Sequence, residues 1–196
     1  MKYNQVEPFI DEEDIDNVTD YLKSGGWITE HGKTRELEEN IKSFVGRDYA
    51  TAVPNGTIAI YLSLLGLGLK NKRIAVPNIT MIATINSILW AESIPVLIDV
   101  DENLCMSYEN LIKNKDIDAV IYVPLNGRTG DGEKINDWCI ENNIPLIEDS
   151  AHSLGSSYKN ISCGNLGSTS IISFTPHKII TMGQGGMVLT LSLIHI

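Results

Sequence analysis

Apolar positions along the chain follow two spacings in alternation, and this alternation predicts a layered α/β fold. Near the N-terminus, Ile15, Val18 and Leu22 recur at helical spacing, and Gly25-Gly26 ends that helix. Beyond residue 46, short apolar or β-branched runs alternate with helical stretches. The expected strands are 49–53, 73–76, 95–100, 119–123, 145–147, 169–174 and 187–190. The expected helices are 11–24, 35–45, 57–67, 81–91, 108–114 and 133–142.

Strands that alternate with helices form crossover units, which favour a mostly parallel sheet with helices on both faces. We therefore expect one domain over residues 1–190, with a seven-stranded sheet and an N-terminal helical arm. In such sheets, ligands bind beyond the carboxyl ends of the strands. Four segments should converge there: PNGT (54–57), PNITM (77–81), EDSAH (148–152) and SFTPHK (173–178).

The last six residues, LSLIHI (191–196), follow the last expected strand without a cap or a polar tail. They match the translation of a sequencing-library adapter, so we expect them to be a non-native tail. The natural chain is then expected to continue past Thr190.

Composition narrows the class of partner. The formal net charge is -10, which argues against nucleic-acid or anionic-membrane partners because both reward clustered Lys and Arg. No run approaches the ~18 apolar residues of a membrane span, and no apolar signal core is present, so we expect a cytoplasmic protein. Cys105, Cys139 and Cys163 lack CxxC spacing and indicate packing roles in a reducing compartment. The histidines and cysteines show no metal-ligand spacing, and no metal site is expected.

The strongest candidate for chemistry is Lys178, which we place at the end of a strand with no neighbouring carboxylate in sequence. A desolvated lysine is less readily protonated, and its free amine can form a Schiff base with an aldehyde and move protons. The alternative is an ordinary solvated lysine in a loop. The adjacent His177 should face the opposite side of an extended strand and should not share this role.

Two other segments supply what a lysine-bound cofactor needs. Asp149 follows a buried apolar run, and a carboxylate there can keep a pyridine nitrogen protonated; alternatively it caps local N–H groups. Gly56 allows close backbone approach, and Thr57 begins a helix whose N–H groups favour a phosphate, or serves as a plain helix cap. Lysine, buried acid and anion cradle are the three fixed points of a pyridoxal phosphate site.

Three further residues carry weaker signals. His152 could hydrogen-bond a ring oxygen or simply pack. Ser173 could donate to the same phosphate as Thr57 or bond to the backbone. Met81 could lie against a flat ring, because its thioether is polarizable, or pack in the core.

Several motifs in fixed order resemble those of the DegT/DnrJ/EryC1/StrS sugar aminotransferases, which are pyridoxal-phosphate enzymes of fold type I. They are SGGWITEHGK, PNGTIAIYLSL, VPNITMIATINSI, VLIDVD, IPLIEDSAHSLG and SFTPHKIITMGQGGMV, and the likeness runs from about Tyr3 to Thr190. The resemblance implies the large domain of that fold, with the smaller C-terminal domain missing. Within the family, PHKIITMGQGG and LNGR (125–128) are most similar to perosamine synthases.

The resemblance implies a role for each residue of the cofactor site. Lys178 is implied as the Schiff-base lysine, and Asp149 as the partner of the pyridine nitrogen. Gly56, Thr57 and Ser173 are implied to hold the phosphate.

It also implies that His152 lies near the ring hydroxyl and that Trp27 and Thr29 line the substrate pocket. Family members usually carry an aromatic residue at the position of Met81, so a methionine there departs from the pattern for covering the ring.

The implied reaction transfers an amino group, usually from glutamate, to a keto group of a nucleotide-linked 6-deoxy sugar, for polysaccharide or glycoconjugate biosynthesis in a homodimer. One branch of the family replaces the lysine with histidine and dehydrates sugars, so Lys178 favours transamination. A protein that binds cofactor or sugar nucleotide without turnover is an alternative, against which Lys178 and Asp149 both argue. A third possibility is that these residues alone are inactive, because such enzymes build active sites between subunits.

Overall fold

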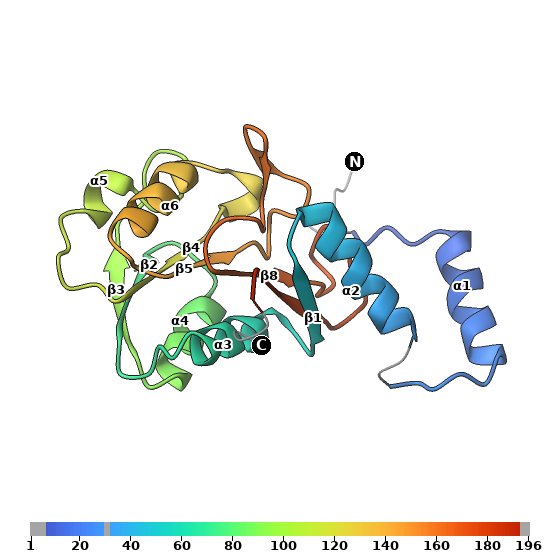
Figure 1. Cartoon of the computed structure of the whole chain (residues 1–196). Helices are drawn as coiled ribbons and strands as arrows, with labels where there is room; N and C mark the ends of the chain where they lie inside the picture. Colours follow the sequence, from blue (N-terminus) through green and yellow to red (C-terminus); the bar gives the residue numbers. More distant parts are fainter. Residues whose placement is uncertain (1–6, 30–31, 193–196) are drawn as a thin grey trace.

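A seven-stranded sheet lies at the centre of the computed structural model, which describes residues 7–29 and 32–192 (Figure 1). Its strand order is β1-β9-β8-β5-β4-β2-β3. The strands are β1 (Tyr49–Val53), β2 (Arg73–Pro77), β3 (Ile94–Ile98), β4 (Ala119–Tyr122), β5 (Leu146–Asp149), β8 (Thr169–Ser173) and β9 (Gly186–Thr190). β9 is antiparallel to its neighbours β1 and β8, and the other pairings are parallel. The predicted seven-stranded, mostly parallel sheet is confirmed.

Helices cover both faces of the sheet, as the alternating pattern predicts. They are α1 (Glu12–Lys23), α2 (Gly32–Val45), α3 (Gly56–Gly66), α4 (Ile82–Trp90), α5 (Tyr108–Leu111), α6 (Gly132–Glu141) and the 3-10 turn η1 (Leu125–Gly127). In Figure 1, α3 and α4 lie below the sheet, and α5 and α6 lie above it.

Two local expectations differ from the structure. The helix expected over 108–114 ends at Leu111, because Asn114 N–H bonds back to the Leu111 carbonyl in a turn. A small hairpin, β6 (Ser157–Tyr158) and β7 (Ile161–Ser162), was not predicted. Each of its strands has two residues, which is too short to show a periodic pattern.

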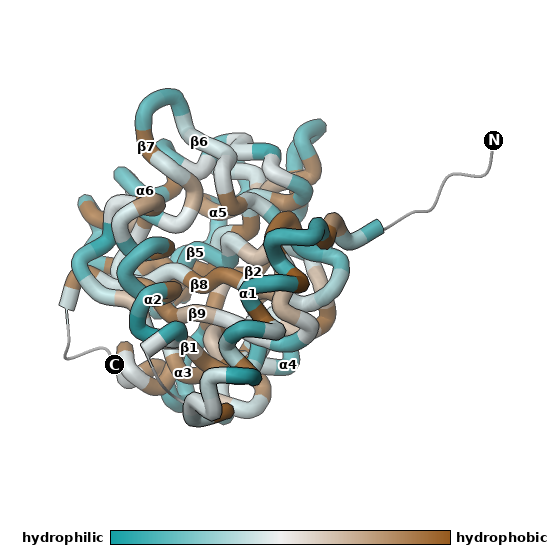
Figure 2. The backbone as a smooth tube through the Cα atoms, turned by 90° about the vertical axis from the view of Figure 1, so that its right-hand side faces the viewer, coloured by the Kyte–Doolittle hydropathy of each residue, from teal (hydrophilic) through white to brown (hydrophobic). Residues whose placement is uncertain are grey.

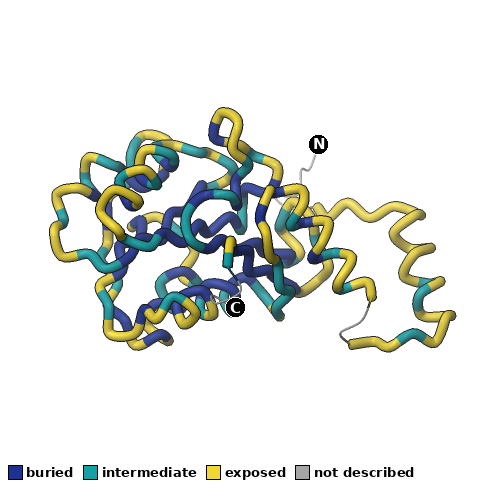
Figure 3. Tube along the Cα trace, viewed as in Figure 1, coloured by how far each residue is buried: buried dark blue, intermediate teal, exposed yellow. Residues whose placement is uncertain are grey.

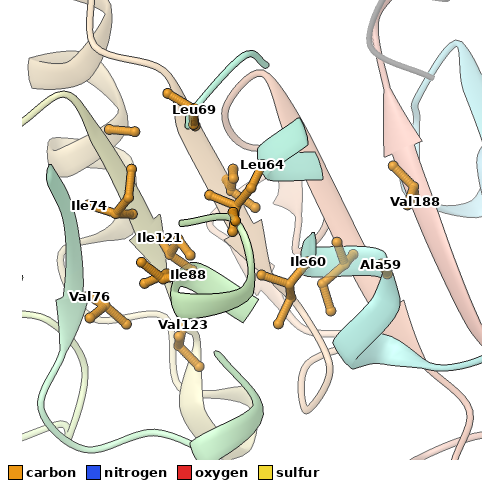
Figure 4. Close-up of a cluster of buried hydrophobic side chains, with 14 residues drawn as sticks. Ala59, Ile60, Leu64, Leu69, Ile74, Val76, Ile88, Ile121, Val123 and Val188 are labelled. Carbon is orange, nitrogen blue, oxygen red and sulfur yellow. The ribbon is translucent and has the colours of Figure 1, made fainter. Parts of the chain in front are cut away.

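The core between the sheet and the α3–α4 pair gives the site a rigid base. Leu64, Ile74, Ile88 and Ile121 are fully buried there and pack together (Figure 4). Each such side chain contributes roughly 1.5–3 kcal/mol by its burial. Figure 2 shows the hydrophobic stretches gathered in the central strands, with hydrophilic stretches around them.

Alternation along the strands decides which side chains reach each face. On β5, Ile147 belongs to the cluster under α3 and α4, whereas Leu146 belongs to the cluster under α5 and α6. By the same two-residue period, Asp149 shares the face of Ile147, and Glu148 lies on the opposite face.

The N-terminal arm stands away from the body of the domain (Figures 1 and 3). Asp11 and Asp14 form a capping box at the start of α1, as befits a helix that begins in solvent. None of the residues of α1 is buried, and Val18 and Leu22 are 61% and 60% exposed. The predicted helix is confirmed, but most of its apolar face stays exposed.

The cysteines, the helices and the C-terminal residues can also be compared with what the sequence predicts. Cys105, Cys139 and Cys163 are free and buried, as their predicted packing roles require. In the described part of the chain, no helix has both the length and the apolar character of a membrane span. The expected non-native tail, 191–196, lies outside the described residues except for 191 and 192.

Candidate active site

One cleft opens where the carboxyl ends of β1, β2, β4, β5 and β8 meet the α3–α4 face. Its lining includes Asn55, Gly56, Thr57, Thr80, Met81, Thr84, Val123, Leu125, Asp149, His152, Ser173, Thr175, His177 and Lys178. The four segments expected to converge from the sequence therefore do so.

Asp149 is the last residue of β5, and its side chain is buried at the base of the cleft. Thr84 Oγ1 donates a 2.8 Å hydrogen bond to Asp149 Oδ2, and Ala151 N–H donates to Oδ1 at 3.3 Å. Burial raises the pKa of Asp149, while these two hydrogen bonds and the charge of Lys178 act in the opposite direction. Each carboxylate oxygen has two lone pairs, so Asp149 can accept a further donor from the cleft.

Lys178 enters the cleft from a turn, which corrects the sequence analysis. β8 ends at Ser173, and Lys178 N–H bonds to the Thr175 carbonyl at 3.0 Å. Because residues 175–178 turn, His177 and Lys178 both line the cleft, and the strand alternation that separated them does not apply.

The Lys178 side chain is half-buried, and its amine has no hydrogen bond or ion pair with any other described residue. Burial lowers the pKa of Lys178, and the charge of Asp149 partly opposes this shift. The result is an amine that gives up its proton more readily than a surface lysine does, which is the condition for nucleophilic chemistry.

His152 leaves one ring nitrogen without a partner. Its Nδ1 is buried and has no hydrogen bond to another described residue. Burial lowers the pKa of His152, and the charges of Lys178 and His177 lower it further. A buried, unpaired nitrogen beside a cleft is a position that a ligand group can satisfy.

The turn from β1 into α3 forms the other end of the cleft. Gly56 and Thr57 are the first two residues of α3, whose N-terminal N–H groups have no acceptors inside the helix. The Asn55 side chain accepts from Ile58 N–H at 3.0 Å and so caps the helix. Helix N–H groups, the helix dipole and the hydroxyls of Thr57 and Ser173 together favour an anion.

Close packing holds that turn against the sheet. A Cβ atom at Gly56 would lie 3.0 Å from Ser173 Cβ and 3.3 Å from its Oγ. A Cβ atom at Gly186 of β9 would lie 2.4 Å from the Asn55 carbonyl carbon. The chain therefore brings the backbone of the turn to the strand surface at a distance that only glycine permits.

Some expected residues occupy the edge of the site or lie outside it. Met81 lines the cleft at its rim, is 57% exposed, and precedes α4 without capping it through its side chain. Trp27 and Thr29 are exposed on the loop after α1 and do not line the cleft of their own chain; Trp27 is 72% exposed.

Three residues of the cleft were not expected there from the sequence: Thr84, Thr175 and His177. Thr84 holds Asp149, and its own hydroxyl lies 3.1 Å from Thr80 Oγ1. The available signal was a hydroxyl in the first turn of an otherwise apolar helix that follows one of the converging segments. The hydroxyl oxygens of Thr175 and Ser173 lie 3.4 Å apart.

The residues of the cleft fit a phosphorylated aromatic aldehyde better than a metal ion. Within the described ranges, no group of three or more His, Cys, Asp and Glu side chains is placed to hold a metal. The lysine amine, the buried carboxylate and the unpaired His152 nitrogen surround a space that ends in an anion-binding helix terminus.

Comparisons with known proteins agree with this chemistry. The sequence model of the DegT/DnrJ/EryC1/StrS aminotransferase family matches residues 8–192. The GDP-perosamine synthase of Escherichia coli O157:H7 is 37% identical over 199 residues, covering 97% of this chain and 54% of the relative. The UDP-4-amino-4-deoxy-L-arabinose–oxoglutarate aminotransferase of Shewanella sediminis is 36% identical over 187 residues, covering 93% of this chain and 48% of the relative.

Solved structures share the fold. The PLP form of Spr1654 from Streptococcus pneumoniae has a TM-score of 0.87 and 28% identity, covering 100% of this chain and 55% of that one. The chain spans about half the length of the curated relatives it matches.

Proposed function

This chain belongs to the DegT/DnrJ/EryC1/StrS aminotransferase family, and from that premise we propose that it is the cofactor-binding large domain of a pyridoxal-phosphate-dependent sugar aminotransferase. The acceptor we propose is a keto group on a nucleotide-linked 6-deoxy sugar, and the amino donor is glutamate. The observation that carries the proposal is the presence of Lys178 and Asp149 in one cleft that ends at the N-terminus of α3.

When bound, pyridoxal phosphate supplies an aldehyde that can carry an amino group and an aromatic ring that accepts electrons. Lys178 Nζ is the amine that would hold this aldehyde, and its lowered pKa keeps a larger share of it unprotonated near neutral pH. Once free of the aldehyde, the same Nζ is the base that takes up and returns a proton.

The remaining residues orient the cofactor. Asp149 would accept a hydrogen bond from the protonated pyridine nitrogen, and this partner would compensate the cost of burying its charge. Gly56, Thr57 and Ser173 would bind the phosphate, and His152 would bond the ring hydroxyl. Met81, at the rim, would cover one face of the ring.

The acceptor sugar and the assembly are further parts of the proposal. Two relatives carry GDP and UDP in their names, which supports a nucleotide sugar but leaves its base open. We propose a cytoplasmic homodimer in which Trp27 and Thr29 contact substrate in the cleft of the second copy. Their exposure on the arm, away from their own cleft, supports this arrangement.

The half-reaction with glutamate tests the function. In the full-length protein loaded with cofactor, glutamate alone should convert the cofactor to its amine form, with one 2-oxoglutarate released per site. Lys178→Ala should abolish the conversion. A wild-type protein that binds cofactor but does not convert it would contradict catalysis and favour a non-catalytic binding role.

The same assay on the 196-residue chain tests whether this domain works alone. We expect little or no conversion, because the proposed substrate contacts come from a second copy and the relatives are about twice as long. Conversion at the rate of the full-length protein would show that the domain is sufficient.

A further inference from the structure

The loop that leads into β8 is held between two buried ionisable side chains, Arg47 and Glu148. Leu166 lies in this loop, three residues before β8 begins. Its N–H donates to Glu148 Oε2 at 2.8 Å, and its carbonyl accepts from Arg47 Nη2. One residue of the loop therefore connects Arg47 to Glu148, and its hydrogen bond from the Arg47 guanidinium is charge-assisted.

Arg47 satisfies three carbonyls of this loop. Its Nε donates to the Gly164 carbonyl at 2.8 Å, its Nη1 to Gly167 at 2.9 Å, and its Nη2 to Leu166. The residue is 4% exposed, and burial lowers its pKa to about 10, which leaves the guanidinium charged at neutral pH. A planar guanidinium with five N–H donors can bind three carbonyls at once, which a lysine cannot.

Glu148 binds the same loop through the N–H of Leu166. It is fully buried on the face of β5 opposite Asp149 and accepts from Tyr158 Oη at 3.0 Å as well as from Leu166. It precedes Asp149 directly, so the backbone that fixes one carboxylate also fixes the other. The cofactor site uses Asp149, and nothing in the proposed reaction uses Glu148 or Arg47.

The hydrogen bonds of the two residues lie next to the junction of β5 and β8. Glu148 pairs with Ser170 and Asp149 with Ile171 in the parallel β5–β8 register. β8 then continues to Ser173 and to the turn that carries Lys178. An anchor that joins the end of β5 to the entry of β8 therefore sets the separation between Asp149 and the groups after β8.

We infer that Arg47 and Glu148 are positioning residues for the cofactor site, which clamp the loop at Leu166 and thereby hold Asp149 in register with Ser173 and Lys178. This inference rests on the proposed function. Neither residue touches the cleft, so their effect reaches the cofactor through the backbone of β5 and β8.

The test measures cofactor binding separately from stability. Glu148→Ala and Arg47→Met should lower the affinity of the full-length apoprotein for pyridoxal phosphate by about tenfold or more, since each leaves buried polar groups without partners. Both should also shift the pH midpoint of the bound cofactor's absorbance in the same direction as Asp149→Asn. Glu148→Gln, which can still accept from Leu166 N–H, should restore most of the affinity.

Leu111→Ala is the matched control, because Leu111 is fully buried in the cluster on the same face of the sheet, does not line the cleft and makes no hydrogen bond to the loop. It should lower the melting temperature and leave affinity and pH midpoint unchanged when measured below the transition. If Glu148→Ala and Arg47→Met behave like Leu111→Ala, the inference is overturned and the proposed function stays intact. A wild-type protein that binds no pyridoxal phosphate would instead overturn the proposed function and this inference with it.

Discussion

At the scale of single residues, burial acts on two ionisable groups of the cleft with opposite results. It lowers the pKa of Lys178 and raises the pKa of Asp149, because in each case the charged form is the one that burial disfavours. Each charge partly offsets the shift of the other. Burial therefore disfavours the charged forms of both the amine and the carboxyl group, and a ligand that pairs with either group would offset that cost.

The reactivity of Lys178 should show this shift directly. The unprotonated amine is the nucleophile, so its acylation in the apoprotein should reach half its maximal rate at a pH below 10.5, the ordinary lysine value. Asp149→Asn should move this midpoint lower still, because the carboxylate charge raises the pKa of Lys178. Acylation of the peptide that contains residue 178, followed by mass spectrometry across pH, measures both. A midpoint at or above 10.5 would show that the amine is solvated.

Residues with distinctive chemistry could be predicted for the cleft from the sequence, whereas residues whose role depends on three-dimensional contacts could not. Lys178, Asp149 and Gly56 stand in segments with recognisable composition, and the structure brings them to one cleft. Thr84 shows no such signal, because its function comes from lying opposite Asp149 across a helix–strand contact. His177 was expected to face away from Lys178 because both were placed on an extended strand. Residues 175–178 form a turn instead, and both side chains line the cleft.

At the scale of elements, the site depends on a turn pressed between two strands. The β1–α3 turn contacts Ser173 of β8 through Gly56 and approaches Gly186 of β9 through its own backbone. The helix terminus that would bind phosphate is therefore placed by the sheet surface under it.

Gly186→Ala should damage both stability and anion binding. The new Cβ would meet backbone atoms of Asn55 and Gly56, which cannot yield as a flexible side chain does. Overpacking of this kind costs about 1–3 kcal/mol, and the displaced turn should bind pyridoxal phosphate more weakly. Chemical denaturation and equilibrium dialysis check the two effects. Gly32→Ala, where a Cβ would meet nothing within 4 Å, is the control and should leave the affinity for pyridoxal phosphate unchanged without lowering stability.

For the arm helix α1, in contrast, we expect substitutions to have little effect on stability. Val18→Ala and Leu22→Ala should change the unfolding free energy of the monomeric 196-residue chain by less than about 0.5 kcal/mol, because both side chains are mostly exposed. Leu64→Ala and Ile88→Ala, in the core, should cost about 2–5 kcal/mol. An equally large loss from the arm variants would mean that α1 packs against the body in solution.

Element positions were largely predictable because most strands and helices here are long enough to show their period. The short hairpin β6–β7 was not, and neither was the end of α5, where a local turn replaces the helix. Strand order was also beyond the sequence, since the antiparallel insertion of β9 between β1 and β8 leaves no mark in the hydrophobic pattern.

At the scale of the whole molecule, the described residues form a seven-stranded sheet, a cleft at the carboxyl ends of its strands and an N-terminal arm with a largely exposed helix. The curated relatives are about twice as long, and the arm carries the two residues proposed to contact substrate. Under the proposed function, a second copy and a further domain would determine which sugar is aminated, whereas the residues proposed for amino transfer lie in this chain.

The proposed chemistry depends on Lys178 as the amine that would hold the cofactor. Borohydride reduction of the full-length protein with pyridoxal phosphate, followed by digestion and mass spectrometry, should place one phosphopyridoxyl group on Lys178, and Lys178→Ala should carry none in the cleft. A group found on another lysine in the wild-type protein, or no incorporation at all, would contradict the account.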